Sequence, residues 1–172
     1  MKSRNPFPWS LLTVVFVVVY STNGFTQKVL PEITIISSNY KYLNALSPEE
    51  AAQPVNMLEH YAAAYDVKES GLYEEEHDTY IVSFHIPEGK ILASYDDEGT
   101  LVRTAERYKN IALPKQVVQA VAKRFPQWAI TKDAFVVNYY SGTNVTKKIY
   151  KLLLENGDKR LRVKVSDSGD FL

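Results

Sequence analysis

The stretch from Leu113 to Trp128 constrains the fold most, because two prolines bracket a short helical pattern. Pro114 suits the first position of a helix, where the backbone N–H is unpaired in any case, and Pro126 cannot continue the hydrogen-bond ladder. The stretch therefore predicts a helix of about three turns with one buried face. The apolar side chains of that face are Leu113, Val117, Val118, Val121 and Phe125.

Strand-like alternation follows this helix to the end of the chain. In the last full strand Leu161, Val163 and Val165 alternate with basic residues, which predicts one apolar side and one basic side. Two further strands are predicted within 128–155. The simplest partner for the helix is therefore an antiparallel sheet built from the C-terminal third of the chain.

The same order of patterns occurs earlier in the chain. Residues 47–50 have the sequence of a capping box, which starts a helix. Pro54 is expected to interrupt that helix, and the better-patterned part runs from Val55 to Tyr65. Its apolar stripe, shifted by 60 positions, coincides with the later one. The stripe consists of Met57, Leu58, Tyr61, Ala62 and Tyr65.

Strand patterns follow this earlier helix as well. They cover 68–74, 79–86, 90–96 and 100–107. The sequence therefore predicts an α+β fold of two tandem repeats, each a helix followed by an antiparallel β-meander, with the helices on one face of the sheet. The first repeat spans 47–110 and the second spans 111–172.

The two repeats differ in charge. Residues 28–102 contain 4 Lys/Arg and 14 Asp/Glu, whereas residues 103–172 contain 14 Lys/Arg and 6 Asp/Glu. The first repeat is therefore acidic and the second basic. Two interpretations stay open: solvated faces that differ without consequence, or complementary surfaces that dock with each other or with a charged partner.

The N-terminus is typical of an exported protein. Residues 1–24 predict a signal peptide, with cleavage between 24 and 27, because Lys2 and Arg4 precede an apolar run that is shorter than the about 20 residues of a membrane span. An uncleaved anchor is the alternative. Residues 28–46 are rich in β-branched and aromatic side chains and predict an extended N-terminal arm. We expect a periplasmic or secreted protein with no stable membrane span after cleavage.

The chain shows no familiar catalytic apparatus. It has no cysteine, which excludes disulfides and thiolate metal sites, and no glycine-rich phosphate loop or nucleophile elbow. His77 and His85, with carboxylates close in sequence, offer atoms that zinc accepts, but their spacing matches no compact motif. We predict no catalytic residue, no metal ligand and no bound cofactor.

Several of these motifs resemble the PepSY-like, β-lactamase-inhibitor-like exported proteins of bacterial envelopes. The similarity rests on Leu113-Pro114, Phe125-Pro126 and the turns at 97–99 and 167–169, and covers about residues 47 to 172. The first repeat departs from the motif, with Gln53 in place of the leucine and Asp66 in place of the second proline. The resemblance implies an exported, non-enzymatic module of binding or inhibitory type.

The basic side of the last strand is the predicted binding surface. The expected partner is a protein or an envelope polymer, and not a nucleic acid, because we expect export. Two alternatives stay open: a small envelope enzyme, a hydrolase or nucleotidyl transferase using His77 and His85, or a structural envelope protein that self-associates by charge. The candidate partner-binding residues are Arg160, Arg162, Lys164, Lys151 and Tyr139.

Overall fold

The structure, a computed structural model, describes residues 39–46, 51–74, 76–143 and 145–172. These residues belong to one compact unit, Ile33–Leu172. The predicted signal peptide, the capping box and residues 28–38 of the arm lie outside the described residues. The helices and strands of the described part are α1 (Tyr40–Leu46), α2 (Gln53–Ala64), β1 (Thr79–Ile86), β2 (Gly89–Asp96), β3 (Leu101–Lys109), α3 (Lys115–Arg124), β4 (Ala129–Tyr140), β5 (Val145–Asn156) and β6 (Lys159–Ser166).

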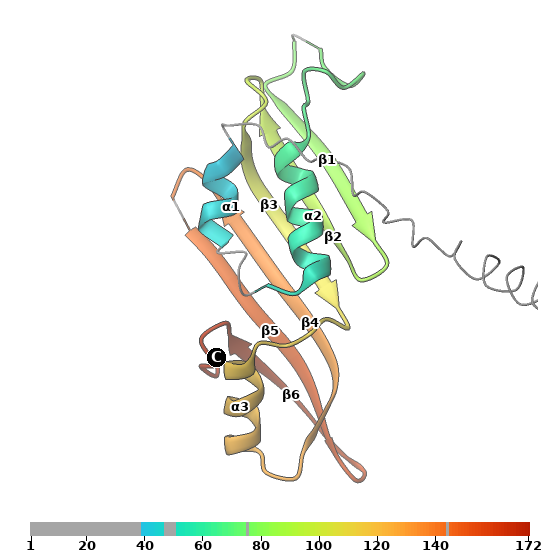
Figure 1. Ribbon diagram of the computed structural model, residues 1–172, viewed down its shortest axis with the longest axis vertical. Coiled ribbons are helices and arrows are strands. Elements are labelled where there is room, and N and C mark those ends of the chain that lie inside the picture. The colour runs from blue at the N-terminus through green and yellow to red at the C-terminus, as the bar shows by residue number, and fades with distance from the viewer. Residues whose placement is uncertain (1–38, 47–50, 75, 144) are drawn as a thin grey trace, which may run out of the picture. The chain divides into compact units, whose positions relative to one another are not determined.

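The six strands form one antiparallel sheet in sequence order, β1 to β6 (Figure 1). Each strand pairs with the next along the chain, and β3 pairs with β4 although α3 separates them in sequence. The register of β3 with β4 runs from Arg103 opposite Tyr140 to Lys109 opposite Ala134. The predicted α+β class with an antiparallel sheet is therefore confirmed.

Helix α3 forms where the two prolines predict it. Pro114 caps the helix from its extended conformation, and its carbonyl accepts the N–H groups of Val117 and Val118 at 3.1 Å. Val117 and Val121 are buried, as predicted. Val118 is 43% exposed, so its predicted place in the buried stripe is wrong. The 100° step per residue turns it away from the face that Val117 and Val121 share.

Helix α2 begins at Gln53, so Pro54 starts the helix rather than interrupting it. Met57 and Tyr61, predicted to be in the apolar stripe, are 41% and 43% exposed. The buried stripe is rotated around the helix and includes a carboxylic acid, which a search for apolar residues passes over. Its members, spaced at i, i+3, i+4, i+7 and i+8, are Val55, Leu58, Glu59, Ala62 and Ala63.

The described part of the predicted extended arm is helical, which corrects that prediction for residues 40–46. Tyr42, Leu43 and Leu46 lie on the buried side of α1. The Asn39 side chain fixes the start of the helix, because it donates to the Ala63 carbonyl at 3.0 Å and accepts the Leu101 N–H at 2.8 Å. Tertiary contacts therefore override the strand propensity of this stretch.

Residues 68–74 form bends and turns, so the strand predicted there is wrong. The Asp66 carboxylate accepts the N–H groups of Lys68 (2.9 Å) and Glu69 (3.2 Å), and the Ser70 hydroxyl donates to the Val67 carbonyl (2.6 Å). These local bonds satisfy the backbone in a turn and compete with a strand ladder.

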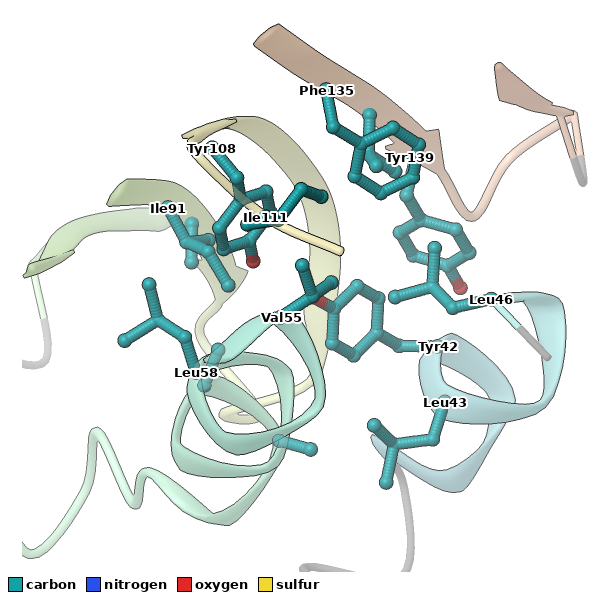
Figure 2. Close-up of a cluster of buried hydrophobic side chains, with 14 of the residues drawn as sticks. Tyr42, Leu43, Leu46, Val55, Leu58, Ile91, Tyr108, Ile111, Phe135 and Tyr139 are labelled. Carbon is teal, nitrogen blue, oxygen red and sulfur yellow. The ribbon is translucent and has the colours of Figure 1, made fainter. Parts of the chain in front are cut away.

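The core contains buried side chains of α1, α2 and the neighbouring strands, some of which Figure 2 shows. Tyr42 of α1 contacts Tyr139 of β4 edge-on, with ring centroids 5.2 Å apart. Helix α2 is joined to β2 by the Tyr95 hydroxyl, which donates to the Ala62 carbonyl at 2.7 Å. Burial of these large aromatic side chains is the dominant source of stability in a chain without disulfides.

Gly89 to Ala is expected to lower the free energy of unfolding by about 1 to 3 kcal/mol, because an added methyl group overpacks the core. A Cβ at Gly89 would lie 2.2 Å from Cδ1 of Tyr108, a fully buried ring on the neighbouring strand. Urea unfolding followed by circular dichroism measures the change. Gly71 to Ala is the control, since a Cβ there meets nothing within 4 Å. Equal stability of the two variants would contradict the close approach at Gly89.

Candidate binding surface

A hollow of about 1000 Å³ lies on the side of the sheet away from the core residues of the strands. Its side chains alternate with buried ones along each strand, as Arg107 and Lys109 do with buried Tyr108. All seven Lys and Arg residues that line the hollow are exposed. We call this surface the basic groove, and its cations are Lys90, Arg107, Lys109, Lys132, Lys151, Arg162 and Lys164.

The strand register brings the cations of the basic groove together. Lys90 lies opposite Arg107, and Lys151 lies opposite Lys164. Ala134 alone separates Lys109 from Lys151 across the sheet. Since strands are about 4.8 Å apart and alternate residues about 6.8 Å, the charged area extends about 19 Å across the strands and about 13 Å along them.

Few carboxylates balance this charge. The ion pairs within the described parts of the chain join His77 to Glu74, Lys148 to Asp167 and Arg160 to Glu155, and none involves a cation of the basic groove. Of the two acidic residues that line the hollow, Asp133 accepts the Ile111 N–H at 3.2 Å and the other is Glu88. The surface is therefore strongly positive and open to an anionic ligand.

Three of the five predicted partner-binding residues, Lys151, Arg162 and Lys164, line the basic groove. Arg160 does not line it, and its Nε lies 3.0 Å from the Glu155 carboxylate. The predicted place of Tyr139 on the open face is wrong, because its side chain is only 2% exposed. Alternation along β4 places Tyr139 on the core side, together with Val137 and Phe135.

Sequence reasoning missed four cations of the groove: Lys90, Arg107, Lys109 and Lys132. Lys90 also lies in the half of the chain that is acidic overall. Only the pairing of β2 with β3 and of β3 with β4 brings these residues to the same face as the last strand. Arg103, Arg107 and Lys109 are separated by even numbers of positions in β3, and this spacing could have predicted that they share one face of the strand.

The structure does not bring His77 and His85 together. His77 lies before β1, with its Nδ1 3.3 Å from Glu74, whereas His85 lies near the other end of that strand, with its Nε2 2.7 Å from the Ser83 hydroxyl. Within the residues that the structure describes, no group of three or more His, Cys, Asp or Glu side chains could hold a metal ion.

A second cluster of polar groups lies inside the core, between the helices and β3. Glu106 is 2% exposed and accepts hydrogen bonds from the hydroxyls of Tyr42 (2.8 Å), Thr104 (2.6 Å) and Tyr108 (3.0 Å). Glu59 of α2, also 2% exposed, is hydrogen-bonded to Glu106. Two carboxyl groups that meet in the core cannot both be ionised, so at least one of them keeps its proton.

Burial is the main cause of the altered acidity of this pair. Burial, and then the charge of Glu106, raise the pKa of Glu59 to about 9, and the charge of Lys148 lowers it by less. Burial also raises the pKa of Glu106, although the hydrogen bonds from Thr104, Tyr42 and Tyr108 lower it. Glu59 is thus the protonated donor at neutral pH and Glu106 the acceptor. Both side chains are enclosed in the core.

No helix of the described residues is long and apolar enough to cross a membrane. Comparison of the chain with protein-family profiles, with curated proteins and with solved structures gives no match.

Proposed function

We propose that this protein is a non-catalytic, exported binding module whose open sheet face recognises an acidic protein segment. The observation that carries the proposal is the basic groove: seven exposed cations on one surface, none of them in an ion pair within the described residues. Charge of one sign in a hollow raises the local concentration of an oppositely charged partner and guides its approach.

The arrangement of the cations favours a ligand over a purely structural role. Like charges directly opposite each other on a sheet destabilise it. Lys90 opposite Arg107 and Lys151 opposite Lys164 are two such pairs. An anionic partner would offset the repulsion within these pairs, so the pairs are more favourable in a complex than in the free protein.

The surroundings of the groove favour a protein over a small anion. The charged area, about 19 Å by 13 Å, is too large for one small anion and suits several carboxylates along a chain. Ile81, Leu92 and Tyr140 lie on the same side of the sheet and are 64%, 48% and 50% exposed. Apolar and aromatic side chains next to arginines are typical of protein interfaces.

We also propose that the fold consists of two related repeats, with the helices on one face. Two turns that are 70 residues apart support this. At both, the glycine has a positive φ and its N–H donates three residues back, Gly99 to Asp96 and Gly169 to Ser166. Each turn is followed by an equivalent pairing, Tyr95 with Leu101 and Val165 with Phe171.

Reversing three cations of the groove tests the binding proposal. The triple variant Lys151→Glu, Arg162→Glu, Lys164→Glu is expected to bind a fluorescent poly-L-glutamate peptide at least about tenfold more weakly, from about 0.5 kcal/mol per lost contact. Fluorescence anisotropy at low salt measures the affinity. Lys151→Glu alone should keep or slightly raise the stability, because it faces Lys164 as an opposite charge.

The control changes the net charge equally, away from the groove. It carries Lys115→Glu, Lys123→Glu and Lys159→Glu, three exposed lysines that do not line the hollow. The control should bind the peptide nearly as well as the natural protein. Equal loss in both variants, or no binding by the natural protein at low salt, would overturn the proposal.

A further inference from the structure

We propose that the acidic segment is supplied by a second copy of this chain, whose acidic end docks in the basic groove of its neighbour. This inference rests on the proposed function of the groove and names its partner. The acidic end consists of exposed carboxylates from the loop before β1 and from the turn between β2 and β3. They are Glu69, Glu74, Glu76, Asp78, Asp97 and Glu98.

The sheet brings these carboxylates to one end. Thr79 at the start of β1 pairs with Asp96 at the end of β2, which places the loop beside the turn. A Cβ at Gly99 of the turn would lie 4.0 Å from Cγ of Lys68 in the loop, a second sign that the two segments are close. Lys68 lies among these carboxylates, and the His77 ring nitrogen is 3.3 Å from Glu74.

The acidic end cannot neutralise the groove of its own molecule. Asp96 at the acidic end and Lys90 of the groove lie on the same strand. The eight residue pairs of β1 with β2 extend over about 23 Å between the acidic end and the turn at Ile86–Gly89. That distance exceeds the screening length of about 8 Å at physiological salt. Within the residues that the structure describes, the acidic end therefore cannot match the charges of the groove in its own molecule, whereas the acidic end of a second molecule can.

The charges of two copies are complementary. The groove presents seven cations and the acidic end six exposed carboxylates. Residues 28–172 contain 18 Lys/Arg and 20 Asp/Glu, so the net charge is close to zero and repulsion between copies is weak at long range. The two surfaces are different patches of one molecule, so the contact is head-to-tail and leaves a free groove and a free acidic end on every pair. Association therefore grows with concentration and weakens with salt.

Sedimentation velocity tests the proposed self-association. It compares the natural protein with variants in which the charges of one surface are reversed. The natural protein should show an average mass that rises with concentration at low salt and returns to the monomer value at high salt. The groove variant, Lys151→Glu with Arg162→Glu and Lys164→Glu, should stay monomeric. The acidic-end variant, Glu69→Lys with Glu76→Lys and Glu98→Lys, should also stay monomeric. An equimolar mixture of the two should associate, because each reversed surface then meets a complementary one.

The control with Lys115→Glu, Lys123→Glu and Lys159→Glu should associate like the natural protein. A natural protein that is monomeric at every salt concentration, association of either variant alone, or a mixture that stays monomeric would overturn the inference. Binding of poly-L-glutamate distinguishes this failure from that of the proposed function. If the natural protein is monomeric but binds the peptide, the groove takes an acidic partner other than itself; if it does neither, both proposals are wrong.

Discussion

Between about pH 5 and about pH 9 the free energy of unfolding is expected to fall as the pH rises, by about 1.4 kcal/mol per pH unit for the proton that Glu59 retains. The pKa of Glu59 is raised from 4.5 to about 9 in the folded protein. In this window the folded state holds a proton that the unfolded state has released, so a higher pH favours unfolding. Urea unfolding at a series of pH values, followed by circular dichroism, measures the slope.

Glu59→Gln isolates this contribution from other titrating groups. The amide keeps a donor for Glu106 but has no proton to release, so the variant should lose most of the downward slope. Its stability should match that of the natural protein near pH 5 and exceed it near pH 8. Parallel pH profiles for the two proteins would show that the buried pair does not retain its proton.

Val121→Asp is expected to lower the free energy of unfolding by about 3 to 5 kcal/mol, enough to unfold a marginal domain. Val121 of α3 is 2% exposed, and an aspartate there places an unpaired charge in the core. Chemical unfolding followed by circular dichroism measures the loss.

Val118→Asp is the matched control, with the same substitution on the same helix. Val118 is exposed, so its aspartate stays in water and should cost less than about 1 kcal/mol. The sequence pattern places both valines in one buried stripe, whereas the structure separates them. Equal losses would favour the stripe and contradict the orientation of α3.

Local patterns were enough to predict most of the sheet. The alternation in β6 predicted that Val165 is buried and that Arg162 and Lys164 are exposed, which is confirmed. These patterns succeed because successive side chains of a strand point to opposite faces of the sheet, whichever strands lie beside it. The strand predicted at 68–74 failed because side chains such as Asp66 bond the local backbone in turns.

The helices were predicted less completely, because a helix stripe depends on what the helix meets. The buried stripe of α2 contains Glu59, whose carboxyl group is hydrogen-bonded to the buried Glu106. From sequence alone, a carboxylic acid in a helix is predicted to face solvent, because such a residue is rarely buried without a partner. Tyr61 is predicted to be in the core from its apolar ring, but it is 43% exposed because the helix buries a different side.

The sequence by itself determined the bracketed helix α3, the alternation of the strands, and the segregation of acidic residues from basic ones. Only the tertiary structure decided which cations share a surface. Lys90 and Arg107 join Lys151 and Lys164 because the strand register aligns them, and Tyr139 leaves the surface for the core. The physical reason is that alternation within a strand is a local property, whereas register and order of strands arise from contacts between residues distant in sequence.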